Sequence, residues 1–227
     1  MAHQKRLSAP KHYPVARKEE PYVAKGKGPK AEEAGVPLVL LLREILELAD
    51  SKSEANNILE EGNVKVNGNI QKDTNFTIGF MDIISLDKVD KDYRVLIDKE
   101  GLVFKEVDDP DSRLFRVEDK TTVKGGKTQL NLDAGVNLLT DEEYDTKGSL
   151  VVNIGDMSVE KNIPLEKGYK AFITGGKHVG EVAEIKEHEV VKGPQENLVK
   201  LESDDKEFET VEEFIFVVGK DEPEVMV

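Results

Sequence analysis

The pattern of apolar and polar positions predicts two helices between residues 37 and 62. Pro37 suits a first helical position, and one face of the helix after it is apolar: Leu38, Leu41, Leu42, Ile45 and Leu48. Ser51 and Glu54 form a capping box, so a second helix is expected to begin near Lys52. Its apolar face consists of Ala55, Ile58 and Leu59. Gly62 is suited to the left-handed position that ends a helix, so we expect this helix to stop there.

A strand pattern follows the second helix. Val64 and Val66 alternate with Lys65, and Asn67-Gly68 supplies the two positive φ angles of a tight hairpin turn. Lys65 should therefore point away from the two valines. Residues 79–84 predict one further strand.

The rest of the chain is expected to form short strands separated by turns. Strands are expected at 93–97, 102–104 and 114–117, with turns at 98–101 and 108–111. Residues 167–185 read as a strand, a glycine-rich turn and a second strand, with Lys177 and His178 at the exposed tip. Strands at 197–201 and 214–218 would complete a small barrel.

Composition narrows the function classes. The chain has 227 residues and no cysteine, which excludes disulfides, thiolate metal sites and a cysteine nucleophile. Its apolar runs are far too short to span a bilayer, and the N-terminus has no signal-peptide pattern. A soluble, cytoplasmic protein without membrane contact is expected.

Charge is distributed unevenly. The chain carries a net charge of −14, but residues 1–30 hold eight Lys or Arg against two Glu. This leader is rich in proline and has little apolar periodicity, so alone it is not expected to fold. Against RNA its cations would release counterions from phosphates, while His12 and Tyr13 could stack on unpaired bases. Every later part of the chain is acidic, and high intracellular salt or an unusual proton balance would each account for that.

No catalytic or metal pattern is present. Asp108, Asp109 and Asp111 surround a proline as in a turn, and no calcium-loop spacing follows them. The segment 125–128 lacks the upstream glycine of a phosphate-binding loop, because that position is Thr121. The four histidines have no ligand or base–nucleophile spacing, so no enzyme, cofactor or metal site is predicted.

Two segments resemble known nucleic-acid-binding modules. Ser51-Lys52 together with the segment 64–68 resembles the S4-type RNA-binding domain, and residues 167–185 resemble a KOW motif. Together with the basic leader and the closing segment 214–220, they resemble the small-subunit ribosomal protein S4e family of archaea and eukaryotes along essentially the whole chain. The missing C-terminal basic extension points to the archaeal branch.

The resemblance implies an α+β, multidomain fold. Its expected parts are a basic extension (1–36), an S4-type α/β RNA-binding domain (37–88), a central β domain (89–165) and a C-terminal SH3-like (KOW) β-barrel (166–227). It also implies a structural, non-catalytic ribosomal protein, monomeric off the ribosome. Its partners would be small-subunit ribosomal RNA and neighbouring small-subunit proteins.

We predict RNA contacts first from the leader and then from the folded domains: Lys5, Arg6, Lys11, His12, Tyr13, Arg17, Lys18, Lys25, Lys27, Lys30, Arg43, Lys52, Lys65, Asn67, Lys177 and His178. Lys52 stands where S4-type domains often have arginine, so it offers a point charge without a planar fork. Two alternatives stay open at this level. One is an RNA-modifying enzyme with an S4-type domain, for which 89–165 leaves little room; the other is a KOW-containing transcription or translation factor.

Overall fold

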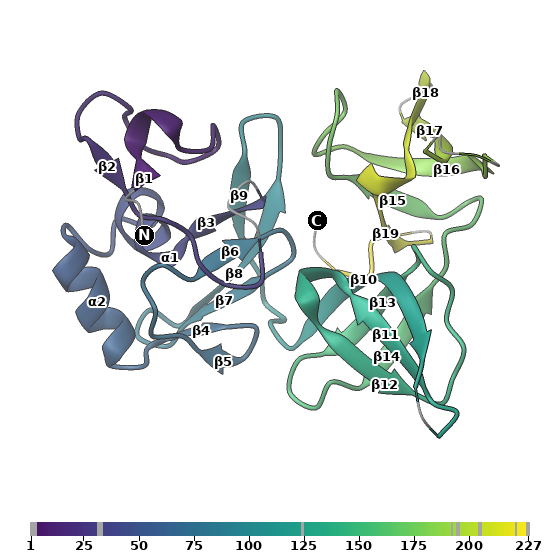
Figure 1. Cartoon of the computed structure of the whole chain (residues 1–227), viewed down its shortest axis with the longest axis horizontal. Helices are drawn as coiled ribbons and strands as arrows, with labels where there is room; N and C mark the ends of the chain where they lie inside the picture. The colour runs from purple at the N-terminus through teal and green to yellow at the C-terminus, as the bar shows by residue number, and fades with distance from the viewer. Residues whose placement is uncertain are drawn as a thin grey trace. The chain divides into compact units, whose positions relative to one another are not determined.

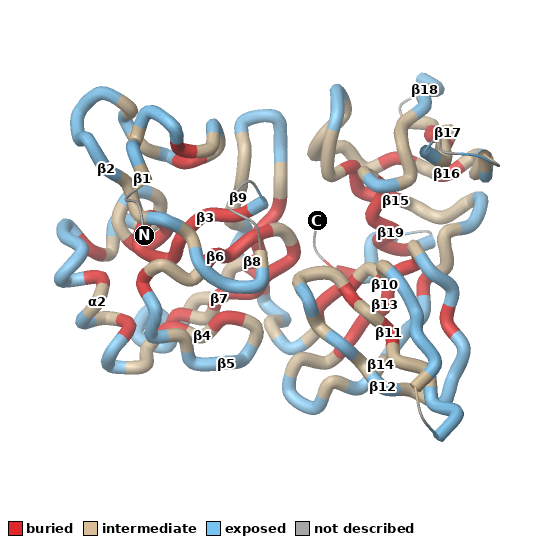
Figure 2. Tube along the Cα trace, viewed as in Figure 1, coloured by how far each residue is buried: buried red, intermediate tan, exposed pale blue. Residues whose placement is uncertain are grey.

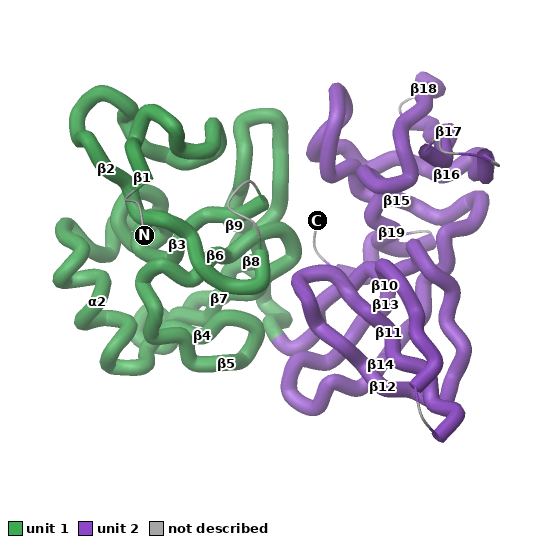
Figure 3. Tube along the Cα trace, viewed as in Figure 1, with its two compact units in different colours: residues 1–110 green, residues 111–227 purple. Residues whose placement is uncertain are grey.

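The computed structural model divides into two compact units, residues 1–110 and 111–227 (Figure 3). It describes residues 4–30, 34–123, 125–191, 193, 196–203, 206–220 and 222–225. Strands predominate in both units (Figure 1). Among the described residues, no helix has the length and apolar character needed to cross a membrane.

The described part of unit 1 contains three sheets, three short helical segments and one longer helix. The sheet orders are β1-β2, β3-β6 and β5-β4-β7-β8-β9, and every pairing is antiparallel. The strands are β1 (Gln4–Lys5), β2 (Tyr22–Val23), β3 (Gly35–Pro37), β4 (Val64–Val66), β5 (Asn69–Ile70), β6 (Thr77–Gly79), β7 (Ile83–Leu86), β8 (Lys91–Ile97) and β9 (Leu102–Glu106). The helical segments are η1 (Arg6–Ser8), α1 (Leu38–Leu40), η3 (Leu41–Ile45) and α2 (Lys52–Glu60).

The second helix and the hairpin form as predicted. Ser51 Oγ accepts the N–H of Glu54 at 3.2 Å, and the Glu54 carboxylate accepts the N–H of Asp50 at 2.9 Å. Gly62 adopts φ +78° just after the helix. Asn67 and Gly68 take φ 49° and 74° and connect β4 to β5, as the Asn-Gly signal requires.

The first helix is shorter than predicted. Pro37 ends β3, and a single α-turn then widens into a π-helical turn, in which Leu46 N–H bonds to Leu41 C=O at 2.9 Å. Glu47 has φ 51° and terminates the segment. Every side chain from Leu38 to Leu42 is buried (Figure 2). The segment is therefore buried on all sides, whereas the sequence predicted a helix with only one apolar face.

The single strand predicted at 79–84 is two strands, β6 and β7. Met81 has φ 63° between them, and the Asp82 carboxylate accepts the N–H of Gly79 at 2.9 Å. Strands β8 and β9 form at the predicted positions. However, β8 pairs with β7, so the expected boundary at 88/89 lies between neighbouring strands of one sheet.

Unit 2 contains two five-stranded antiparallel sheets, ordered β12-β11-β10-β13-β14 and β18-β17-β16-β15-β19. The first consists of β10 (Ser112–Thr122), β11 (Thr128–Leu132), β12 (Asn137–Thr140), β13 (Ser149–Asn153) and β14 (Val159–Ile163), with the turn η4 (Asp133–Gly135). The second consists of β15 (Lys170–Ile173), β16 (Val182–Glu189), β17 (Leu198–Ser203), β18 (Lys206–Val211) and β19 (Ile215–Gly219), with the turn η5 (Glu212–Phe214).

One arginine links these two sheets of unit 2. Arg116 on β10 donates to the carbonyls of Glu213 at 2.6 Å and Ile215 at 3.1 Å, at the start of β19. In the glycine-rich turn after β15, Gly175 lies against the ring of Phe214. A Cβ at Gly175 would meet that ring at 2.7 Å, so the turn requires glycine there.

Candidate nucleic-acid interface

The leader is folded against the rest of unit 1, contrary to the expectation that it lacks fixed structure. Lys27 N–H bonds to Asn75 C=O at 2.8 Å, and Thr77 N–H bonds to Lys27 C=O at 2.7 Å. Ala9 and Tyr13 are buried in the core cluster of unit 1. These apolar side chains are too widely spaced to produce a periodic pattern, but each finds a place in a core built by residues 36–95.

Two arginines of the leader hold its loop together. Arg6 donates to the carbonyl of Ala16 at 2.8 Å. Arg17 donates to the carbonyls of Ala9 and Pro10, both at 2.9 Å, and more distantly to that of Leu7 at 3.4 Å. Both were predicted to contact RNA, but their guanidinium groups are engaged with backbone carbonyls.

Lys30 is a buried anchor and not an exposed cation. Its Nζ lies 2.7 Å from Asp82 Oδ2 and donates to the carbonyl of Phe80 at 2.9 Å. The Lys30 and Asp82 side chains are only 9% and 3% exposed. Lys30 would have to give up this buried pair to bind a phosphate, so the structure gives it a role in holding the leader in place.

The predicted stacking residues are also engaged. Tyr13 is 4% exposed, and its ring meets the edge of His12 at a centroid distance of 5.2 Å. His12 Nε2 lies 2.8 Å from the carbonyl oxygen of Gly35. The exposed aromatic ring of the leader is instead Tyr22, which is 54% exposed and directly opposite Lys5 in the β1-β2 pair. Sequence reasoning missed Tyr22 because nothing in its spacing separates it from Tyr13.

Four lysines of the predicted set in unit 1 are exposed and make no ion pair among the residues that the structure describes: Lys5, Lys11, Lys18 and Lys52. Lys25 is exposed as well, and Lys27 lies 3.8 Å from the exposed Asp73 carboxylate. These lysines are the part of the predicted set whose ammonium groups face solvent. Lys72 and Lys105 were not in that set, but they too are exposed without such a pair.

The surface around the start of α2 is less cationic than predicted. The Glu54 carboxylate already lies at this helix N-terminus. Lys65 points away from the valine side chains as expected, but its Nζ lies 2.8 Å from Asp87. Arg43 lies 3.5 Å from Glu44 and is about one-third exposed. Lys52 is therefore the cation that this surface offers without a carboxylate partner among the described residues.

Asn67 has a structural role. Its amide donates to Asp82 Oδ1 at 2.9 Å, and its carbonyl oxygen accepts the N–H of Ile83 at 2.9 Å. The same Asp82 carboxylate binds Lys30, so one buried group connects the hairpin turn to the leader. The amide of Asn67 is thus engaged within the protein.

The tip of the β15-β16 hairpin presents Lys177 as an exposed side chain. His178 beside it is stacked on Phe208 at a centroid distance of 4.0 Å, and its Nδ1 lies 2.9 Å from Glu181. Of the two predicted tip residues, only Lys177 extends into solvent.

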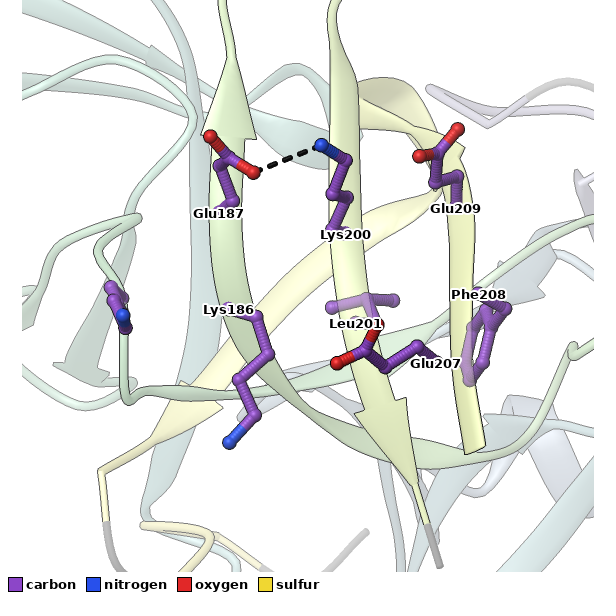
Figure 4. A pocket seen from close by; sticks show the side chains of 8 residues that line it. Lys186, Glu187, Lys200, Leu201, Glu207, Phe208 and Glu209 are labelled. Atoms are coloured by element: carbon purple, nitrogen blue, oxygen red, sulfur yellow. Dashed lines mark hydrogen bonds and ion pairs between the residues drawn. The ribbon is translucent and has the colours of Figure 1, made fainter. Parts of the chain in front are cut away.

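A hollow of about 1030 Å³ lies on the second sheet of unit 2 (Figure 4). Lys186 on its lining contacts Glu184 at 2.9 Å and Glu202 at 2.6 Å. Lys200 contacts Glu187 at 2.9 Å and also Glu189. Hydrogen bonds to these carboxylates raise the pKa of both lysines. The hollow therefore contains lysines whose charge is already compensated.

Among the described residues, no group of three or more His, Asp or Glu side chains is placed to hold a metal ion.

Two segments of the chain match models of known protein families. Residues 36–84 match the model of the S4 domain, and residues 89–159 match that of the ribosomal family S4e. The chain is 42% identical over 220 residues to the small ribosomal subunit protein eS4 of Archaeoglobus fulgidus, covering 96% of this chain and 93% of that one. It is 43% identical over 225 residues to the eS4 protein of Methanosphaera stadtmanae, covering 97% and 93%.

A solved structure agrees. The crystal structure of the 30S ribosomal protein S4e from Thermoplasma acidophilum matches with a TM-score of 0.71 and 29% identity, covering 83% of this chain and 96% of that one. The S4-type domain, the S4e family and its archaeal branch, predicted from the residues, are confirmed. The chain belongs to the ribosomal protein S4e family.

Proposed function

We propose that this protein is a structural constituent of the small ribosomal subunit, where it binds ribosomal RNA and supports subunit assembly and translation. Its place is the cytoplasm, on the ribosome. The family is one of structural ribosomal proteins, so the chain is no enzyme, and neither the RNA-modifying enzyme nor the free KOW factor has support. The observation that carries the RNA contact is that four of the predicted lysines in unit 1 are exposed and make no ion pair among the described residues: Lys5, Lys11, Lys18 and Lys52.

These lysines matter because the chain is otherwise acidic. At a net charge of −14, most of the surface repels RNA, so affinity depends on the sites where ammonium groups stand without carboxylates. Each lysine that neutralises a phosphate releases a condensed counterion, which makes binding salt-dependent. Three of these four lysines, Lys5, Lys11 and Lys18, lie on the folded leader.

The finer assignments extend this proposal. The second sheet of unit 2 is assigned as the SH3-like (KOW) barrel, because its first two strands flank a turn in which Gly176 and Gly180 have positive φ. Lys177 at the tip would add one RNA contact. Neighbouring small-subunit proteins are the expected protein partners. The strong net charge disfavours self-association, so the free protein is assigned as a monomer.

The test is the salt dependence of binding to a small-subunit ribosomal RNA transcript. In one variant Lys5, Lys11, Lys18 and Lys52 become glutamine. In the matched control four ion-paired lysines become glutamine, which changes the net charge equally: Lys91, Lys161, Lys186 and Lys200. We expect the slope of log K against log salt to fall by about three in the first variant and by less than one in the control.

Equal slopes for the two variants would contradict the assignment of these lysines. Failure of the wild-type protein to bind the transcript at physiological salt would contradict the function itself. Point substitutions serve better here than deletion of residues 1–30, because the leader carries part of the core of unit 1.

A further inference from the structure

The leader contains a groove of about 600 Å³ beside the β1-β2 pair, lined by Lys5, Leu7, Arg17, Lys18, Glu19, Glu20, Pro21 and Tyr22. The volume falls within the range of about 300–1,000 Å³ that is typical of small-ligand sites. All lining residues come from one short segment, which the Arg17 guanidinium closes by donating to the carbonyls of Ala9 and Pro10. The groove is thus shaped before any ligand arrives.

Its walls combine a flat ring, an apolar side chain and cations. Tyr22 is 54% exposed and Leu7 is 71% exposed, which is unusual for large apolar side chains so close together. Lys5 and Tyr22 are directly opposite in an antiparallel pair, so their side chains leave the same face of the ribbon about 5 Å apart. A lysine side chain and an exposed aromatic ring therefore project from adjacent positions on this ribbon.

Electrostatics alone would give this groove little affinity. Its lining holds three cations and two carboxylates, and one of the cations, Arg17, is engaged with backbone carbonyls. For a ligand that offers only phosphate, repulsion by the two carboxylates would offset most of the attraction to the lysines. A ligand that also offered a flat base would gain stacking energy on Tyr22 and contact with Leu7.

We propose that this groove binds one unpaired nucleotide of RNA, with the base stacked on Tyr22 and the phosphate beside Lys5 and Lys18. A base inside a duplex is stacked on its neighbours and has no free face, so a paired strand does not fit this arrangement. The inference rests on the proposed RNA-binding function and deepens it, because it names the structural class of RNA that the leader recognises.

The experiment uses the full-length chain with two probes: a short single-stranded oligo(A) and a blunt, fully paired RNA duplex of equal charge. We expect Tyr22→Ala to weaken oligo(A) binding about ten-fold or more, since stacking on an aromatic side chain contributes about that much per base. Tyr22→Phe keeps the ring and should stay within about two-fold of wild type. Binding of the paired duplex should be the same for all three proteins.

A spectroscopic readout tests the stacking itself. The chain has no tryptophan, so Tyr22→Trp introduces a single tryptophan at the groove, and oligo(A) should quench its emission. Tyr169→Trp is the matched control, because Tyr169 has a lysine near its ring, with Lys220 Nζ 5.9 Å from the ring centroid, but lies in unit 2. Its emission should not respond.

The outcomes separate the two proposals. Wild-type affinity of Tyr22→Ala for oligo(A), or quenching equal at both tryptophans, would overturn the nucleotide groove while leaving ribosomal RNA binding intact. Loss of transcript binding by the wild-type protein would overturn the proposed function instead.

Discussion

The leader groove of unit 1 and the hollow on the second sheet of unit 2 contain the same kinds of residue. Each has exposed strands, lysines, glutamates and one aromatic ring, Tyr22 in the groove and Phe208 in the hollow. They differ in how the lysines are partnered. Lys5 and Lys18 have no ion pair among the described residues, whereas Lys186 and Lys200 each contact two carboxylates. Figure 4 shows one of these contacts, between Lys200 and Glu187.

This difference shows why lysine content is a poor guide to RNA binding in an acidic chain. A lysine already bonded to two glutamates must give up those bonds to reach a phosphate, and the released carboxylates then repel the RNA. A lysine without such partners breaks no bond when it binds a phosphate and leaves no carboxylate to repel the RNA. The RNA-binding surface is thus defined as much by missing carboxylates as by cations present.

The largest expected effect concerns the anchor of the leader. Lys30→Met leaves the buried Asp82 carboxylate without its 2.7 Å partner, so we expect a loss of about 3–5 kcal/mol in the free energy of unfolding. Lys186→Met removes a cation from the exposed sheet and should leave the unfolding midpoint nearly unchanged. Urea denaturation of both variants measures this, and equal midpoints would show that the leader is not held by the buried pair.

The second effect concerns the shape of the groove. Arg17→Lys keeps the charge but loses the planar fork that reaches the carbonyls of Ala9 and Pro10, so the loop should loosen by about 1–2 kcal/mol. Limited proteolysis should then cut the leader faster. Arg43→Lys serves as the control for proteolysis, because Arg43 lies outside the leader. An unchanged cleavage rate for Arg17→Lys would mean that other contacts shape the loop.

The third prediction is that the hollow of unit 2 gains RNA affinity when its lysines lose their carboxylate partners. Changing Glu184, Glu187, Glu189 and Glu202 to glutamine frees Lys186 and Lys200 on the sheet. We expect the salt slope of RNA binding to rise by about one to two. Four exposed glutamates that make no ion pair with these lysines in the described part of the chain are the charge-matched control: Glu100, Glu143, Glu166 and Glu196. If the control raises the slope equally, net charge and not local pairing governs binding.

The smallest effect is a pH dependence in unit 2. Burial raises the pKa of Glu118, but the contacts from Lys147 at 2.9 Å and Arg116 at 2.5 Å outweigh it, so the pKa is lowered from 4.5. Because the folded-state pKa is lowered, this stabilisation is present above pH 4.5 and is lost as the pH falls further. Glu118→Gln should therefore be less stable than wild type at pH 7, and denaturant titrations should show this difference shrinking as the pH is lowered below 4.5. A difference independent of pH would exclude this origin.

Local signals in the sequence were reliable where they depended on short-range geometry. The cap at Ser51, the left-handed Gly62 and the Asn67-Gly68 turn all form, because each depends on a few neighbouring backbone groups. The helix predicted from Pro37 onward failed because Leu38–Leu42 is buried on every side, which a one-sided pattern cannot anticipate.

The candidate site was harder to predict. Composition located the cations in the leader, but it could not distinguish Lys30, which is buried against a carboxylate fifty-two positions away, from Lys18, which faces solvent. Likewise Tyr13 and Tyr22 are equivalent in local sequence, and only long-range packing buries one and exposes the other. These distinctions depend on tertiary contacts, for which the sequence holds no local signal.

The docking of the leader on the core of unit 1 also has a calorimetric consequence. A segment that became ordered only on contact with RNA would bury new apolar surface at that moment and show a large negative heat-capacity change. Here Ala9 and Tyr13 are already buried in the free chain. Folding of the leader should therefore contribute little to the heat-capacity change measured when the protein binds the transcript. A large negative change would instead indicate that the RNA rearranges on binding.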